Sequence, residues 1–166
     1  MTKKLFSGLF LSIVISFVAA VSWAADLPKV TASTETDAGR YLVKIGGCND
    51  CHTPMYAPKA GKVPESDWLV GDILGYRGPW GTTYPTNLRL YFQEISEDEW
   101  VNNKVFKKAK PPMPWFNLMA MSDQDLRAIY RYIKSLGAKG GKAPAYLPPD
   151  QNPNPPFIQW PAPPPQ

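Results

Sequence analysis

The clearest repeating pattern of hydrophobic positions lies between Ser122 and Gly137. Apolar side chains recur there every three or four residues, which places them on one face of a helix. Ser122 and the acidic residues after it can cap the start, and Gly137 can end the helix in a left-handed conformation. We therefore predict a helix between these two residues, whose apolar stripe consists of Leu126, Ile129, Tyr130, Ile133 and Leu136.

Two shorter helices are expected upstream of this one. Polar residues 34–37 can cap a helix over residues 38–45, which is followed by two glycines. Residues 96–99 have the Ser-x-x-Glu spacing of a capping box, and they predict a helix that runs through Val105 and turns Trp100 inward. Three helices joined by long loops make this a single all-α domain.

Residues 53–93 show no sustained hydrophobic period and are instead rich in proline and glycine. A structureless segment of this length is uncommon in a compact domain unless a function or a bound group organises it. The aromatic side chains in and near this segment are candidates to line such a group, although ordinary packing would also account for them. They are Trp68, Tyr76, Trp80 and Tyr84.

The start of the chain has the pattern of an export signal. Lys3 and Lys4 precede a stretch without charged residues that extends to Ala25 and has a strongly apolar centre. Small residues near its end favour cleavage after Ala24, so residues 1–24 are expected to form a signal peptide. An uncleaved membrane anchor is the alternative, because the uncharged stretch is just long enough to span a bilayer. Either alternative puts the rest of the chain on the periplasmic side.

The remaining residues number about 142, which suffices for one small domain and not for two. Residues 142–166 hold ten of the 19 prolines, so this tail is expected to be neither helix nor central strand, and the domain is assigned to residues 25–141. The apolar residues of the tail could clamp a partner protein or fold back on the domain. They include Phe157, Ile158 and Trp160.

The net charge of the chain argues against nucleic acid as a partner. The 18 basic residues include two in the export signal, which leaves 16 against 14 acidic residues, a net charge near +2. Nucleic-acid-binding domains carry a far larger positive excess.

The chemistry of the chain is concentrated in the pentapeptide Cys48-Asn49-Asp50-Cys51-His52, which contains every cysteine and the single histidine of the sequence. Two thiols at this spacing can each add to a haem vinyl group, while the adjacent imidazole ligates the iron. Three alternatives fit less well. Structural zinc needs four ligands, a thioredoxin-like dithiol needs a preceding strand, and a disulfide this short would leave the histidine unexplained. The motif therefore predicts covalent haem c, whose apolar faces could organise the loop over residues 53–93.

A second axial ligand to the iron has to be sought among the methionines, because no other histidine exists. Met55 is too close to His52 to reach the opposite face of the ring. Met121 can be explained as a hydrophobic contact at the start of the following helix. Met113 lies between prolines that hold the chain extended and could present its thioether at little ordering cost, so it is the favoured ligand. Met119 or Met121 remains an alternative, as does an open or non-sulfur site.

Taken together, these segments resemble a class I c-type cytochrome, most closely the haem domains of cytochrome subunits of bacterial membrane-bound dehydrogenases. The resemblance implies the class I cytochrome c fold and ligation of iron by His52 and Met113. It also implies that the first and last helices cross, bringing Tyr41 towards Tyr132 and Ile133. The matching segments are residues 39–43, 48–53, 81–88, 112–115 and 121–130.

The expected function is that of a periplasmic monohaem c-type cytochrome, and not of an enzyme. Such a protein would carry single electrons from a dehydrogenase or quinol-oxidising complex to a terminal oxidase or reductase. A haem enzyme or gas-binding protein with an open sixth iron position is the alternative. A basic cluster ahead of Met113 could steer redox partners electrostatically, or it could be an ordinary solvated loop. The cluster consists of Lys104, Lys107, Lys108 and Lys110.

Overall fold

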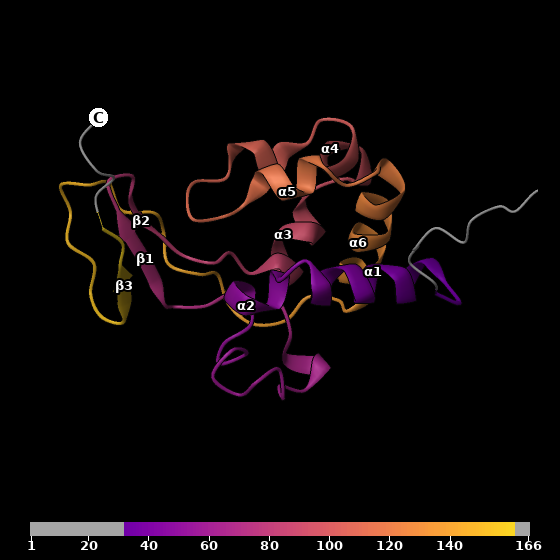
Figure 1. The fold of residues 1–166 in the computed structure, drawn as a ribbon, viewed down its shortest axis with the longest axis horizontal. Helices are drawn as coiled ribbons and strands as arrows, with labels where there is room; N and C mark the ends of the chain where they lie inside the picture. The colour runs from indigo at the N-terminus through magenta and orange to yellow at the C-terminus, as the bar shows by residue number, and fades with distance from the viewer. Residues whose placement is uncertain (1–31, 162–166) are drawn as a thin grey trace, which may run out of the picture.

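The computed structural model describes residues 32–161, so the expected signal peptide over residues 1–24 lies outside the described residues. Within this range the chain is mostly helical, with a small sheet at one end (Figure 1). The helices are α1 (Glu35–Ile45), α2 (Cys48–His52), α3 (Leu88–Glu94), α4 (Glu97–Val101), α5 (Trp115–Met119) and α6 (Asp123–Ser135), with 3-10 helices at Glu65–Asp67 and Val105–Lys108. The strands are β1 (Gly75–Gly78), β2 (Gly81–Thr83) and β3 (Phe157–Gln159).

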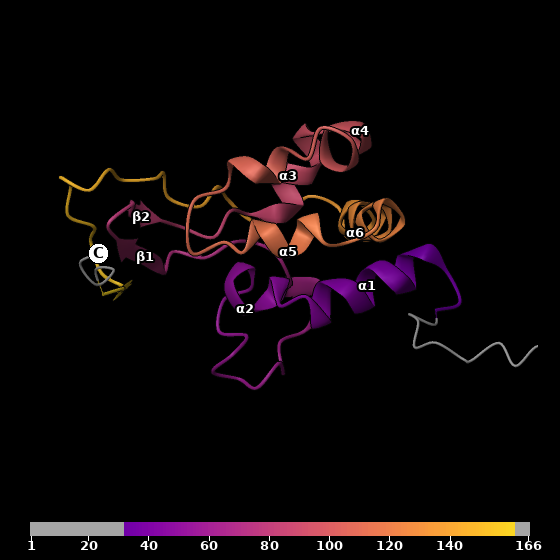
Figure 2. The same ribbon diagram turned by 45° about the horizontal axis from the view of Figure 1, so that its top comes forward.

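Helices α1 and α6 pack against each other and cross, as the two ribbon views show (Figures 1 and 2). Gly39 makes this close approach possible, because a Cβ atom there would lie 2.0 Å from the backbone oxygen of Ala128 on α6. Tyr132 and Ile133 are buried on α6, whereas Tyr41 is 48% exposed. The expected crossing of the first and last helices is therefore confirmed, with Gly39 at the contact and Tyr41 largely exposed to solvent.

Helix α6 agrees with its prediction at both ends. Ser122 Oγ accepts a hydrogen bond from Asp125 N at 3.1 Å, and Gly137 adopts a left-handed φ of 70°. The buried side chains of the helix include Leu126, Ile129 and Ile133 of the predicted stripe. Local capping and periodicity were sufficient to place this element.

The capping box at residues 96–99 is confirmed, but the helix it opens is shorter than predicted. Ser96 Oγ accepts from Glu99 N at 3.2 Å, and the Glu99 carboxylate accepts from Ser96 N at 2.8 Å. Helix α4 ends at Val101, and Lys104 takes a left-handed φ of 49° before the 3-10 helix Val105–Lys108. Two short helices, α3 and α5, were not predicted because seven and five residues are too few to display a helical period.

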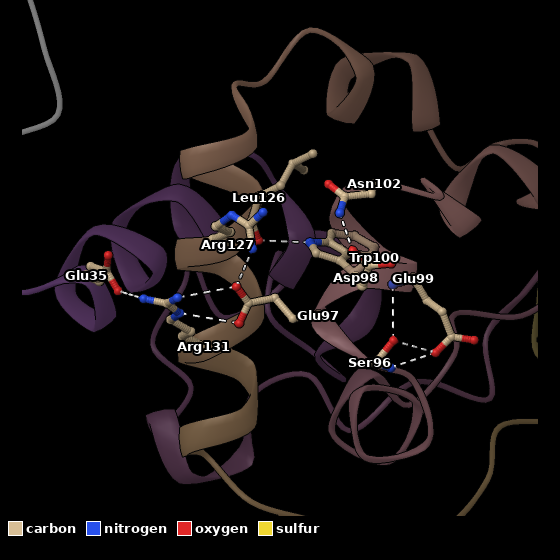
Figure 3. Close-up of polar contacts among 10 residues, drawn as sticks. All are labelled: Glu35, Ser96, Glu97, Asp98, Glu99, Trp100, Asn102, Leu126, Arg127 and Arg131. Carbon is tan, nitrogen blue, oxygen red and sulfur yellow. Dashed lines mark hydrogen bonds and ion pairs between the residues drawn. The ribbon is translucent and has the colours of Figure 1, made fainter.

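The helices enclose an aromatic core. Phe92 of α3 lies with its ring centroid 4.8 Å from that of Trp100 on α4 and 5.6 Å from that of Tyr130 on α6. The indole Nε1 of Trp100 donates a hydrogen bond to the Leu126 carbonyl at 2.9 Å (Figure 3). The same view shows Arg131 of α6 between the carboxylates of Glu35 and Glu97, which links the starts of α1 and α4 to α6.

A three-stranded sheet with the order β2-β1-β3 lies apart from the helices, at the left of Figures 1 and 2. The β1 and β2 strands pair antiparallel, with Tyr76 opposite Thr83, and β3 of the tail pairs parallel to β1. The sheet was not predicted, since its longest strand has only four residues. Because β3 is an edge strand, the described part of the tail, through residue 161, contributes no central strand, as expected. In the part of the chain that the structure describes, no helix combines the length and apolarity required to cross a membrane.

Candidate functional site

The five residues of the cysteine motif form α2, a single turn of helix. Gly47 precedes it with a left-handed φ of 72°, which reorients the chain after α1. Residues three and four positions apart share a helix face, so the spacing brings Cys48, Cys51 and His52 to one side. Both cysteines are free and half-buried, and His52 is buried.

The imidazole of His52 is held in one orientation by the backbone. Its Nδ1 atom lies 2.7 Å from the carbonyl oxygen of Thr86. A carbonyl oxygen can only accept, so Nδ1 carries the proton and Nε2 keeps a free lone pair. Burial lowers the pKa of the His52 imidazole, opposed in part by this hydrogen bond. A neutral imidazole with one nitrogen fixed in this way is the usual form of a metal-ligating histidine.

The Cys48 thiol does not have the environment of an attacking thiolate. Burial, with a smaller contribution from Asp50, raises the pKa of the Cys48 thiol to about 11. Reactive cysteine pairs instead have at least one depressed pKa, which supplies the attacking thiolate. Among residues 32–161, no group of three or more His, Cys, Asp and Glu side chains lies close enough to hold a metal ion. The raised pKa of Cys48 counts against the dithiol alternative.

A cavity of about 680 Å³ joins the motif to the predicted sixth ligand. Cys48, Cys51, His52 and Met113 all line it. Helices α3, α4, α5 and α6, together with the 3-10 helix Val105–Lys108, supply an apolar wall that suits a flat hydrophobic ring system. The side chains of this wall are Phe92, Trp100, Phe106, Leu118, Ile129 and Ile133.

The segment around Met113 is fixed by the fold as well as by its prolines. Met113 N donates to the Lys110 carbonyl at 3.2 Å, and Trp115 N donates to the Met113 carbonyl at 2.9 Å. The Thr83 hydroxyl donates to the Pro111 carbonyl at 2.8 Å, which ties this segment to β2. The segment was expected to be extended, but it turns before α5 begins.

The other methionines of the described chain take no part in this cavity. Met55 is 54% exposed and lines a second cavity of about 740 Å³, which also includes Tyr56 and Ile73 and contains neither thiols nor Met113. Met119 and Met121 pack against the hydrophobic core. Of the methionines in residues 32–161, Met113 is the one whose side chain lines the cavity with His52.

Two of the four aromatic residues expected to line a bound group do so. Tyr76 and Tyr84 line the cavity, and the Tyr76 hydroxyl lies 3.5 Å from Cys51 Sγ as a donor. Trp68 instead packs edge-on against Tyr56, and Trp80 packs edge-on against Trp160. Sequence reasoning missed Tyr91, Phe106 and Tyr146, whose positions depend on α3, the short 3-10 helix and the tail.

The four lysines of the basic cluster lie in different environments. Lys104 forms an ion pair with Asp123 at 3.0 Å. Lys108 and Lys110 line the cavity, and Lys110 Nζ lies 4.5 Å from the ring centroid of Tyr146. Lys107 is exposed and does not line the cavity. The four lysines therefore do not act as one group: one is ion-paired, two line the cavity and one lies outside it.

Three curated relatives were found among bacterial dehydrogenase subunits. The chain is 29% identical over 126 residues to the gluconate 2-dehydrogenase cytochrome c subunit of Pantoea cypripedii, covering 68% of this chain and 29% of that relative. It is 28% identical over 135 residues to the cytochrome c subunit of the quinone-dependent alcohol dehydrogenase of Gluconacetobacter polyoxogenes, covering 74% of this chain and 24% of the relative. The chain thus spans less than a third of the length of each relative, and no solved structure matches it.

A family model described as cytochrome c matches residues 36–137, more than half of the chain. The matched range begins in α1 and ends at the left-handed glycine after α6, so it contains the motif, the Met113 segment and most of the cavity. Members of this family carry haem c with its iron as a covalently bound cofactor, and the apolar cavity with free thiols and a neutral imidazole fits that group. The chain belongs to the cytochrome c family, as a class I c-type cytochrome whose cofactor is covalently bound haem c.

Proposed function

We propose that the protein is a periplasmic monohaem electron carrier or electron-transfer subunit in which Cys48 and Cys51 attach the haem and His52 and Met113 ligate the iron. The observation that carries this proposal is the shared cavity, which has two thiols and an imidazole on one turn of helix and a thioether from a separate segment. The two thiols would attach the haem covalently, and the imidazole and the thioether would supply the two axial ligands of a six-coordinate iron.

The protein's contribution is to keep both ligands in place. The Thr86 carbonyl fixes the His52 ring, and two backbone hydrogen bonds with the Thr83 contact fix the turn that carries Met113. When bound between imidazole and thioether, haem iron supplies reversible one-electron transfer at a raised potential. Because the ligands are fixed by backbone contacts, little of this chain has to move between oxidation states.

The partners we propose follow from the relatives, which are named as cytochrome subunits of a gluconate and an alcohol dehydrogenase. An electron donor of the dehydrogenase kind, or a quinol-oxidising complex, would deliver electrons to the haem. A terminal oxidase or reductase would accept them. Lys107, together with Lys108 at the mouth of the cavity, would favour approach of an acidic partner surface. Covalent attachment after export supports the periplasmic location.

The visible absorption spectrum of protein produced with haem-attachment machinery tests the proposal. Wild type should show low-spin haem, a sulfur-to-iron charge-transfer band in the ferric form, and no binding of carbon monoxide in the ferrous form. Met113→Ala should lose the band and bind carbon monoxide, whereas Met55→Ala and Met121→Ala should retain the wild-type spectrum. A high-spin wild type that binds carbon monoxide readily would favour an enzyme or gas-binding protein instead.

A further inference from the structure

The charged residues of the haem cavity are unevenly distributed. Lys108 and Lys110 line it, and none of its described lining residues is an aspartate or glutamate. Neither lysine forms an ion pair within residues 32–161. Haem carries two carboxylates, on the pair of pyrrole rings that bears no vinyl group. These carboxylates cannot be placed against the apolar wall around Phe92 and Ile129 without a large desolvation penalty.

The tail contributes to the lining of the cavity. Pro144 and Tyr146 of the tail line the cavity, as do Thr83 of β2 and Lys110. Lys110 Nζ lies 4.5 Å from the ring centroid of Tyr146, so a residue of the ligand segment and a residue of the tail meet here. The proline-rich tail is therefore part of the cavity wall.

Several contacts hold the tail in this position. Tyr146 OH donates to the Trp80 carbonyl at 2.7 Å, and Thr82 and Leu147 exchange two backbone hydrogen bonds of 2.7 and 3.0 Å. The Arg77 guanidinium donates to the carbonyl oxygens of Gln151 and Pro149 at 2.6 and 3.2 Å. Further along, β3 completes the sheet beside β1.

A tail anchored at this many points is a fixed element of the domain. Many backbone and side-chain hydrogen bonds hold the tail against the domain, and each contributes part of the stabilising free energy. Tyr146 therefore keeps its position without a partner protein. Of the two alternatives left open for the tail, residues 146–160 show the one in which it folds back on its own domain.

We propose that Lys108 and Lys110 bind the two haem carboxylates, that Tyr146 positions Lys110, and that the tail is a strap closing this end of the cavity. Two ammonium groups match two carboxylates in charge, and charge-assisted hydrogen bonds are the strong ones. The Tyr146 ring holds Lys110 by a cation–π contact, and with the rest of the strap it would cover one side of the bound carboxylates. This inference rests on the proposed attachment of haem at Cys48 and Cys51.

Chemical modification of the folded holoprotein tests the strap. A water-soluble carbodiimide with glycinamide couples accessible carboxylates, and mass spectrometry of the haem-bearing peptide locates the added groups. In wild type the exposed Asp50 carboxylate should be coupled while the haem carboxylates stay unmodified. Tyr146→Ala should make the haem carboxylates couple several-fold faster. Asp50 serves as the internal control because it lies in the same peptide.

The reduction potential tests the lysines independently and remains informative if Tyr146→Ala does not fold. Lys108→Gln and Lys110→Gln should lower the midpoint potential, because each removes a positive charge that favours the ferrous form. Lys110→Arg keeps the positive charge and should therefore have a midpoint potential close to that of wild type. Lys59→Gln is the matched control, because Lys59 is exposed like Lys108 and Lys110 but does not line the cavity, and it should leave the potential unchanged.

Two results would overturn the inference. One is coupling of the wild-type haem carboxylates as fast as Asp50, and the other is an equal drop in potential for Lys59→Gln and Lys110→Gln. A peptide containing residues 48–52 without haem mass would instead overturn the proposed attachment, so the two failures are distinguishable.

Discussion

His52 Nδ1 lies 2.7 Å from the carbonyl oxygen of Thr86, which is 34 residues further along the chain. This contact joins α2 to the segment that leads into α3 and fixes which ring nitrogen faces the cavity. In a ligating histidine such a hydrogen bond sets ring orientation and increases ligand basicity.

The contact predicts a protected ring proton. In the ferrous, diamagnetic holoprotein the Nδ1–H of His52 should be visible by 1H–15N NMR and should exchange slowly with solvent, because the side chain is only 8% exposed and its proton is engaged. A resonance broadened by rapid exchange at neutral pH would show that the Thr86 contact is not maintained.

The crossing of α1 and α6 predicts an unusual response to a glycine replacement. Alanine is ordinarily better than glycine in a helix by up to about 1 kcal/mol. Gly39→Ala should instead destabilise by roughly 1–3 kcal/mol or more, since its Cβ would clash with the Ala128 backbone oxygen. Denaturant unfolding measures the free energy change.

Gly141→Ala is the matched control for that experiment. An added Cβ there meets nothing within 4 Å, and φ is not in the left-handed region. The free energy of unfolding should be unchanged or slightly increased. Equal losses for Gly39→Ala and Gly141→Ala would contradict the assigned role of the helix crossing.

Replacing the buried Arg89 should strongly lower the free energy of unfolding. Its buried guanidinium donates to the carbonyls of Gly137 at 2.7 Å, Ser66 at 2.9 Å and Leu136, and so caps the C-terminal end of α6. Arg89→Met should lower the free energy of unfolding by about 2–3 kcal/mol, because hydrogen bonds to charged groups are strong and the carbonyls would be left unpaired.

Arg131→Met is the comparison for Arg89. Arg131 bridges Glu35 and Glu97 on the surface with its side chain 44% exposed (Figure 3). Exposed ion pairs contribute about 0–1 kcal/mol, so this variant should lose much less stability than Arg89→Met. Similar losses for the two variants would show that burial of Arg89 contributes little.

The pH dependence of stability should include a contribution from Glu97. Hydrogen bonds from Arg127 and then Arg131 hold the pKa of the Glu97 carboxyl below its ordinary value of 4.5, despite some burial. A depressed folded-state pKa gives stability that is complete above the ordinary value and is lost as pH falls through the folded value. The contribution is about 0.5 kcal/mol, because the arginines are largely exposed.

Comparing the free energies of unfolding of wild type and Glu97→Gln at several pH values measures that contribution. The difference in unfolding free energy between wild type and Glu97→Gln should be present at pH 7 and should disappear well below pH 4.5. Glu94→Gln offers a control, since Glu94 is exposed and 3.8 Å from Lys142. A Glu97→Gln difference that is constant from neutral to strongly acidic pH would rule out this linkage.

The salt dependence of electron-transfer rates with small charged oxidants should show whether the surface near the mouth of the cavity is positively charged. Oxidation by ferricyanide, an anion, should slow as salt is raised, and oxidation by a cationic cobalt(III) complex should accelerate. Lys107→Gln should weaken both dependences without changing the absorption spectrum. Rates indifferent to ionic strength with both reagents would remove electrostatic steering from the proposed function.

The sequence alone determined the features that depend on neighbouring residues. The chemistry of α2 follows from five consecutive residues, because one helical turn brings two thiols and an imidazole together whatever surrounds them. The capping box at Ser96 and the ends of α6 are likewise local, since each hydrogen bond joins residues three or four apart. Helical periodicity over 13 residues was long enough to read.

Only the tertiary structure decided the features that join distant segments. The position of Met113 in the cavity, the tautomer of His52 set by Thr86, and the contact of Lys110 with Tyr146 all depend on loops converging from far along the chain. No local pattern encodes such convergence. The proline content of the tail predicted that it forms neither helix nor central strand. Its position beside β1 depends instead on hydrogen bonds to Arg77 from residues 72 to 75 positions away in the sequence.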